Sequence, residues 1–195
     1  MPGQPLESDR RSPGNSNAVI DKAMSEVVLR RAKIEDASQI HAIFSHYVHT
    51  SIATYYFTPP PVSLIRAKIE RSISNDLFPF FVAVAGDTVL GYVYGSEYRV
   101  LEGYRHVIED SIFIHPDHVG RGVGKKLLGS LIEECQTLGY KRMVAVFGSG
   151  REELPGTFRL HESFGFREVG RLLGVGEKFG RTLDTPILQL NFDAS

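Results

Sequence analysis

A glycine-rich segment constrains this chain more than any other feature. Glycines stand at every second position of Gly120–Gly124, between an apolar alternation over residues 107–114 and a leucine-rich stretch that begins at Lys125. The alternation predicts a strand, because successive strand side chains point to opposite faces. Pro116 ends it, because proline has no N–H to donate to a ladder. The stretch after the glycines has the apolar spacing of an amphipathic helix, so we expect a strand, a glycine loop and a helix in succession.

The expected glycine loop has the chemistry of an anion site. It presents free backbone N–H groups at the positive end of a helix dipole, and Arg121, Lys125 and Lys126 add cationic side chains. A Walker A motif would need glycine where Val119 stands and a hydroxyl side chain at position 126. A dinucleotide fingerprint would need G-x-G-x-x-G, whereas the spacing here is G-x-G-x-G. The loop thus predicts a phosphate or pyrophosphate ligand of another kind, with a ligand-free connection as the alternative.

Length and charge limit the domain number and the partners. The chain has 195 residues, of which 42% are hydrophobic, which is enough for one domain with a substantial core. Its formal net charge is −1, so neither nucleic acid nor an anionic membrane is an expected partner. The sequence has no apolar run near the ~18 residues that a membrane-spanning helix needs.

The chain has a single cysteine, Cys135. A disulfide within the chain is impossible, so we expect a reducing, cytoplasmic compartment. Cys135 falls on the apolar face of the helix after the glycine loop. That position predicts a buried structural thiol, with a nucleophile as the alternative.

Residues 1–26 differ in composition from the rest of the chain. They are rich in proline, glycine and serine and lack the apolar core of a secretory signal. We expect a disordered leader here, with Arg10 and Arg11 leaving a targeting role as the alternative. The folded domain is then expected over residues 27–195.

The periodicity of apolar residues, together with residues typical of turns and helix ends, predicts strands and helices over the rest of the chain. Asp36 is an expected N-cap, Gly86-Asp87 an expected hairpin turn, and Gly165 an expected helix stop. Strands are expected at 27–31, 80–85, 88–97, 106–114, 141–147, 166–175 and 186–192, and helices at 36–49, from about 63, at 122–138 and at 157–164. This order predicts an α/β domain of mixed α+β character, with one sheet packed by helices.

Taken in order, the motifs of this chain resemble the GNAT superfamily of N-acetyltransferases. Within it they are similar to the phosphinothricin / methionine-sulfoximine acetyltransferase group, over about residues 27–192. The glycine loop carries the resemblance together with Ser51–Thr54, Val89–Tyr94, Tyr104-Arg105, Glu109–Ser111, Gly139-Tyr140, Met143–Val146, Leu160–Glu162, Gly165-Phe166 and Lys178–Arg181.

The resemblance implies a fold, a reaction and a cofactor site. The fold would be a single domain whose central, mostly antiparallel sheet is splayed at the middle and flanked by helices. The enzyme would transfer an acetyl group from acetyl-CoA to the primary amine of a small molecule, foremost a phosphinothricin- or methionine-sulfoximine-like amino acid. It would act as a homodimer and without a metal ion. The cofactor's pantetheine arm would pair with the backbone of Ile112 and Ile114, the Ile112 N–H would polarise the acetyl carbonyl, and the pyrophosphate would lie on the backbone N–H groups of Arg121, Gly122, Val123, Gly124 and Lys125.

Two side chains are candidates for proton transfer. An ammonium has no lone pair, so the reaction needs a base, and in this family the glutamate that matches Glu109 takes the amine proton. A solvated carboxylate or a salt bridge with Arg105 is the alternative for Glu109. His161 stands where many superfamily members have a tyrosine that protonates the departing thiolate. The alternative for His161 is a structural histidine.

Substrate recognition is where the chain departs from the group. Tyr55, Arg99 and Tyr104 are the expected substrate contacts, but the second arginine of the group's pair is replaced by Leu101, so a bidentate carboxylate clamp is not expected. Val119 replaces the usual Gln or Arg at the start of the loop, which removes a side-chain contact and leaves the backbone cradle. Two alternatives stay open: an acceptor amine without a carboxylate, such as a polyamine or arylalkylamine, and a non-catalytic acyl-CoA-binding module.

Overall fold

Strands and helices alternate along the chain much as the periodicity predicts. The computed structural model describes residues 27–192. Within that range no helix combines the length and the apolar character needed to cross a membrane. The helices are α2 (Ala37–Thr50), α3 (Val62–Ser74), α4 (Val123–Thr137) and α5 (Pro155–Glu162), and the strands are β1 (Val28–Arg31), β2 (Phe80–Ala85), β3 (Thr88–Glu97), β4 (Val107–Ile114), β5 (Arg142–Val146), β6 (Arg167–Lys178) and β7 (Arg181–Asn191).

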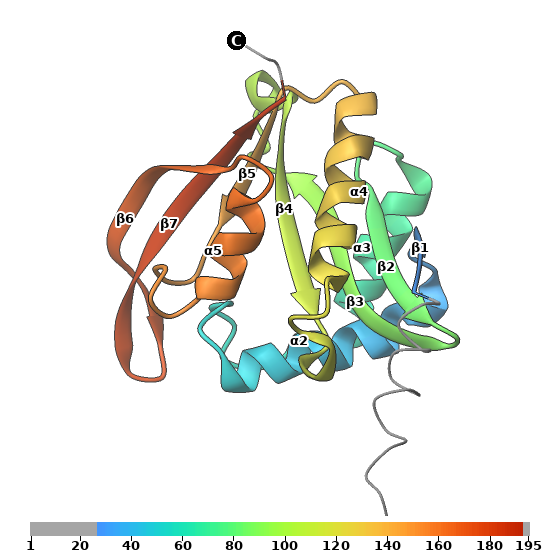
Figure 1. Cartoon of the computed structure of the whole chain (residues 1–195), viewed down its shortest axis with the longest axis horizontal. Coiled ribbons are helices and arrows are strands. Elements are labelled where there is room, and N and C mark those ends of the chain that lie inside the picture. The colour runs from blue at the N-terminus through green and yellow to red at the C-terminus, as the bar shows by residue number, and fades with distance from the viewer. Residues whose placement is uncertain (1–26, 193–195) are drawn as a thin grey trace, which may run out of the picture.

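The strands form one seven-stranded sheet in the order β1-β2-β3-β4-β5-β7-β6 (Figure 1). Every neighbouring pair is antiparallel except β4 and β5, which are parallel. The expected α/β fold with a mostly antiparallel sheet is therefore confirmed. The leader predicted over residues 1–26 lies outside the described residues.

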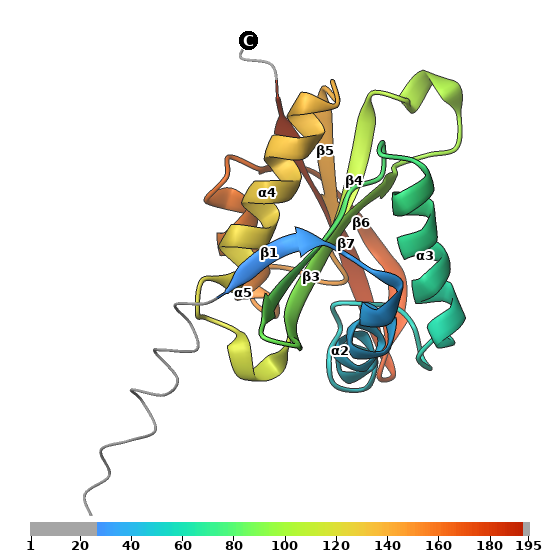
Figure 2. The same cartoon turned by 90° about the vertical axis from the view of Figure 1, so that its right-hand side faces the viewer.

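The sheet buries an apolar cluster on each face. Figure 2 shows helices α4 and α5 on one side of the strands and helices α2 and α3 on the other. Helices α4 and α5 contribute to one cluster, which includes Ile108 of β4. Helices α2 and α3 cover the other, against which Phe113 of β4 packs. Because strand side chains alternate between faces, consecutive residues of β4 serve opposite faces of the sheet.

The sheet parts between its two parallel strands. Only Val107, Ile108 and Glu109 of β4 pair with β5. On its other side β5 pairs with β7 along its whole length, and β4 stays paired with β3 as far as Ile114. The edge of β4 that faces β5 therefore has no ladder partner over residues 110–114, and its backbone groups are free to bind something else.

The last hairpin is longer than the sequence predicts. Strands β6 and β7 run to Lys178 and from Arg181, and Phe179 and Gly180 join them in left-handed conformations at φ 52° and 70°. The sequence predicts that the first of these strands ends at residue 175 and that the second begins at residue 186. The two strands nevertheless pair across the turn, with a register shift between Leu172 and Gly176 that absorbs the irregularity.

Two single-residue expectations have different outcomes. Cys135 is fully buried as expected, and burial raises the pKa of its thiol far above the ordinary range, so it is a structural group. Asp36 precedes α2, but the expectation that its side chain caps the helix is wrong. Its carboxylate instead accepts hydrogen bonds from the Arg30 guanidinium at 2.7 and 2.8 Å and from the Lys33 N–H at 2.8 Å.

Candidate active site

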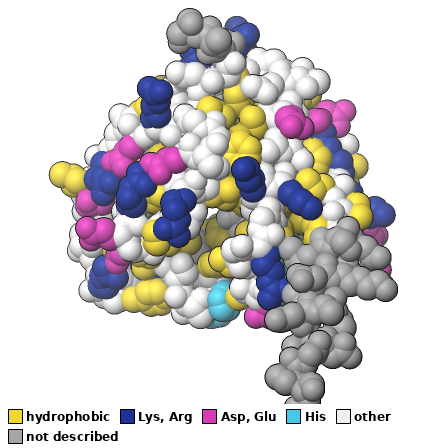
Figure 3. All heavy atoms as spheres, viewed as in Figure 1, with side chains coloured by type: hydrophobic (Ala, Val, Ile, Leu, Met, Phe, Trp, Pro, Cys, Tyr) yellow, Lys and Arg dark blue, Asp and Glu magenta, His cyan; other side chains and the backbone are white. Residues whose placement is uncertain are grey.

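A cavity of about 680 Å³ lies beside the free edge of β4. Its walls come from β4, the glycine loop, α5, the end of β5 and the end of α2. Figure 3 shows a hollow at this place, with hydrophobic side chains at its rim and Lys and Arg side chains around it. The lining includes Tyr47, Asp110, Ile112, Gly122, Leu160 and His161.

The glycine loop has the conformation that an anion cradle needs. Gly120 and Gly122 take φ values of 79° and 81°, which glycine adopts without the strain that a side chain brings. The first α4 N–H bonded within the helix is that of Lys126, to the carbonyl of Gly122. The N–H groups of residues 123–125 have no intrahelical partner, as at any helix start. The loop therefore offers several donors at the positive end of α4.

The predicted cofactor residues share this region but differ in what their side chains do. Gly122, Gly124 and Lys125 line the cavity. The Arg121 side chain is exposed, and that of Val123 is buried in the core. The buried side chain of Val123 cannot reach a ligand, so this residue could contribute only its backbone.

The free edge of β4 faces the same cavity. Ile112 and Ile114 both line it. The hydroxyl of Tyr47 donates a hydrogen bond to the Ile114 carbonyl at 2.7 Å, so α2 already uses one group of this edge. The backbone groups of Ile112 face the gap between β4 and β5 without a ladder partner. An extended amide-containing chain is a suitable ligand for such an edge.

Glu109 is not part of the cavity lining, which begins one residue later at Asp110 and continues along β4 to Ile114. Its side chain is half-buried. Burial raises the pKa of Glu109 to about 7; the charge of Asp110 adds to this rise, and Lys68 and Arg99 oppose it. No ion pair joins Glu109 to Arg105 among residues 27–192. A carboxylate with a pKa near neutrality is suited to act as a general base.

His161 is buried in an apolar box and bonded on both sides of its ring. Its side chain is 1% exposed, and the rings of Phe147 and Phe166 stand edge-on to it at 4.9 and 5.0 Å. Nδ1 lies 2.8 Å from the carbonyl oxygen of Thr157, and Nε2 lies 3.1 Å from Oδ2 of Asp110. Burial lowers the pKa of His161, but the charge and hydrogen bond of Asp110 more than offset this, and the net pKa is raised.

The predicted substrate contacts lie outside the cavity lining. The Tyr55 hydroxyl donates to the Gly148 carbonyl at 3.0 Å and lies 2.8 Å from the Thr185 hydroxyl. The guanidinium of Arg99 lies 5.2 Å from the Tyr98 ring, on which the Tyr104 ring also packs. Arg99 is nevertheless close enough to Glu109 to lower its pKa. Tyr55 thus holds chain segments together, while Arg99 flanks the candidate base.

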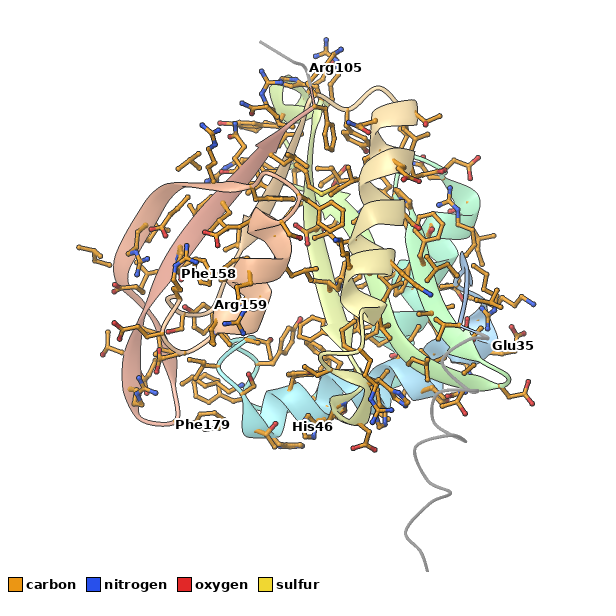
Figure 4. The ribbon with its side chains drawn as sticks, in the orientation of Figure 1. Glu35, His46, Arg105, Phe158, Arg159 and Phe179 are labelled. Atoms are coloured by element: carbon orange, nitrogen blue, oxygen red, sulfur yellow. The ribbon has the colours of Figure 1, made fainter. Side chains whose placement is uncertain are left out.

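Several residues of the cavity wall were not predicted as site residues, among them Tyr47, Asp110 and Arg159. The sequence does mark Asp110 as unusual. It is a charged residue on the face of its strand where the other side chains are isoleucines. Nothing in the sequence separates Tyr47 and Arg159 from other helical residues. Figure 4 shows Arg159 reaching from α5 toward the loop that follows α2.

Comparison with known proteins agrees with this geometry. Residues 40–166 match the model of the acetyltransferase (GNAT) family. A phosphinothricin N-acetyltransferase from Alcaligenes faecalis is 35% identical over 176 residues, which cover 90% of this chain and 87% of that protein. An L-methionine sulfoximine/L-methionine sulfone acetyltransferase from Salmonella typhimurium is 38% identical over 168 residues, covering 86% and 95%.

A solved structure extends the comparison to three dimensions. It is a GNAT superfamily phosphinothricin acetyltransferase from Sinorhizobium meliloti in complex with acetyl-CoA. It is 35% identical to this chain, with a TM-score of 0.78, and the match covers 85% of this chain and 88% of that one.

Proposed function

The chain belongs to the acetyltransferase (GNAT) family as an acyl-CoA-dependent N-acetyltransferase that uses acetyl-CoA, and we propose that its acceptor is the primary amine of a phosphinothricin- or methionine-sulfoximine-like amino acid. The observation that carries the proposal is Glu109. Its carboxylate, with a pKa of about 7, stands at the last ladder pair before β4 and β5 part. A base is thereby held next to the gap that opens between β4 and β5.

In this proposal the cofactor enters through the glycine loop. The N–H groups of residues 121–125 bind the pyrophosphate, and the side chain of Lys125 adds charge at the cavity wall. The pantetheine amides pair with the free edge of β4 at Ile112 and Ile114, which places the thioester near Asp110. The N–H of Ile112 then faces the acetyl oxygen and stabilises the charge that develops there.

Glu109 prepares the nucleophile. The bound ammonium gives one proton to the Glu109 carboxylate, and the free nitrogen lone pair attacks the thioester carbon. A general base in this position is worth roughly 10²–10⁴-fold in rate. The second proton lost by the amine must reach the departing thiolate. His161 is one of the residues that take part in this transfer.

Substrate binding rests on Arg99 in the proposal. It is the one arginine of the expected pair, and it lies near enough to Glu109 to influence that carboxyl electrostatically. An amino acid bound through its carboxylate at Arg99 would present its amine to Glu109. Tyr104, packed with Arg99 around Tyr98, would form the wall of this subsite, and Tyr55 would support the neighbouring loop.

A specific observation favours a second candidate acceptor. Leu101 is 71% exposed where the group's second arginine is expected, so that position supplies no charge. An amine without a carboxylate, such as a polyamine or arylalkylamine, would not need that charge. The retained Glu109 and His161 argue against the third alternative, a non-catalytic acyl-CoA-binding module.

A thiol-release assay with acetyl-CoA tests the proposal. The panel contains phosphinothricin, methionine sulfoximine, methionine sulfone, common amino acids, and the decarboxylated analogue of methionine sulfoximine. We expect the highest kcat/KM on the sulfoximine or phosphinothricin. A clear preference for the decarboxylated analogue would replace the amino-acid acceptor with a simple amine.

We also propose a cytoplasmic homodimer. Strand β6 is an edge strand whose apolar side chains Val169, Leu172, Leu173 and Val175 are 50–74% exposed, which is a surface suited to a second copy. Light scattering at micromolar concentration is expected to give twice the monomer mass. A monomer would remove this part of the proposal and leave the reaction unaffected.

A further inference from the structure

The protons of the buried Asp110–His161 pair can be counted from its hydrogen bonds. The carbonyl oxygen of Thr157 only accepts, so Nδ1 of His161 carries a proton. Nε2 faces Oδ2 of Asp110 at 3.1 Å, and two lone pairs cannot face each other there. One further proton therefore lies between Nε2 and Oδ2. Asp110 raises the pKa of His161, which favours this proton on the ring. The pair is then an imidazolium and a carboxylate, neutral as a whole, and the ring has no nitrogen left for a ligand.

The other oxygen of Asp110 is the group without a partner. The Asp110 side chain is 2% exposed, and its Oδ1 atom is buried with no hydrogen-bond partner among the described residues. Asp110 lines the cavity, next to the β4 edge that holds Ile112. A buried carboxylate oxygen without a hydrogen bond lowers the stability of the fold. Such atoms are rare unless a ligand supplies the missing hydrogen bond. The ligand that fits is a hydrogen-bond donor.

We infer that Oδ1 of Asp110, rather than a nitrogen of His161, touches the reacting atoms and carries the last proton of the attacking amine to the departing sulfur. This inference rests on the proposed function. His161 is then a positioning residue, because its Nε2–H fixes the carboxylate through Oδ2. The box formed by Phe147 and Phe166 shields that bond from water.

The step balances without another reactant. After attack, the tetrahedral carbon bears both nitrogen and sulfur, so one oxygen can reach both atoms. Oδ1 accepts a proton from the positively charged nitrogen. The C–S bond then breaks, its electron pair goes to sulfur, and Oδ1 gives the proton to that sulfur. The nitrogen lone pair becomes part of the amide, CoA leaves as a thiol, and Asp110 returns to a carboxylate.

The inference predicts a rank order for two variants. In Asp110→Asn the amide cannot relay a proton, so kcat should fall at least about 100-fold while the acetyl-CoA dissociation constant, measured by calorimetry, stays within threefold of wild type. In His161→Gln the side-chain amide can place an N–H where Nε2 stands, so Asp110 keeps its donor. Its kcat should stay within about tenfold of wild type. Asp87→Asn, in the exposed β2–β3 turn, is the matched control.

Each outcome either supports or overturns the role of Asp110 in proton transfer. A kcat loss in His161→Gln equal to or greater than that in Asp110→Asn would overturn the inference and make the imidazole the donor. Where Asp110→Asn does not fold, His161→Gln decides alone: retained turnover supports the relay, and a 100-fold loss overturns it. An inactive wild-type protein would instead refute the proposed function, so the two failures are distinguishable.

Discussion

The pH dependence of acetyl transfer is the sharpest test of Glu109. Burial and the neighbouring charge of Asp110 raise its pKa from 4.5 to about 7. The deprotonated form is the base, so activity should be lost as the pH falls through 7. With one titrating group, about half of the plateau kcat/KM remains at pH 7 and about a tenth at pH 6. A glutamate with an ordinary pKa would give a flat profile over this range.

The assay is steady-state thiol release between pH 5.5 and 8.5 with the best amine of the panel. Glu109→Gln should lower kcat/KM at least about 100-fold and abolish the fall of kcat/KM at low pH. Lys68→Gln removes a cation that opposes the rise in the pKa of Glu109, so in this variant the fall of kcat/KM should move to higher pH. Glu133→Gln, on the exposed face of α4, is the control. A flat wild-type profile, or an unchanged fall of kcat/KM at low pH in Glu109→Gln, would refute the assignment of Glu109 as the base.

Further predictions follow from the same structure. Glu109→Gln should stabilise the fold by up to about 3 kcal/mol at pH 8 and little at pH 4.5, because a raised carboxyl pKa costs stability as the pH rises from 4.5 to 7; denaturant unfolding measures this. Gly122→Ala should weaken acetyl-CoA binding in calorimetry and cost about 1 kcal/mol of stability, whereas Gly170→Ala on β6 should not weaken binding. Leu101→Arg should lower KM for phosphinothricin without changing KM for the decarboxylated amine. Cys135 should react with a thiol reagent only after unfolding.

The parts of the site that sequence predicts are those made by neighbouring residues. The strand, glycine loop and helix over residues 107–137 follow from local alternation, a proline stop and backbone freedom at Gly120 and Gly122, and the structure contains all three. The family pattern then supplied the splayed sheet, which periodicity alone does not give. The strand, the glycine loop and the helix can each be predicted because each depends on the residues within its own segment.

Long-range contacts cannot be predicted from a single segment. Asp110 and His161 are 51 positions apart, and only the packing of α5 against the sheet brings them to 3.1 Å. The hydroxyl of Tyr55, an expected substrate contact, lies 2.8 Å from the hydroxyl of Thr185, which is 130 positions away in the chain. The extension of β6 and β7 through a glycine-rich turn likewise depends on pairing between strands, which overrides local propensity.

Two adjacent carboxylates on one strand can have separate roles because strand side chains alternate. Glu109 lies toward α2 and α3, and burial raises the pKa of its carboxyl. Asp110 lies toward α5, where one of its oxygens is bonded to the His161 ring and the other has no hydrogen-bond partner among the described residues. The first is suited to hold a proton taken from an ammonium, and the second is placed to pass one on. Both flank the point where β4 leaves β5, so a thioester in that gap has one carboxylate on each side.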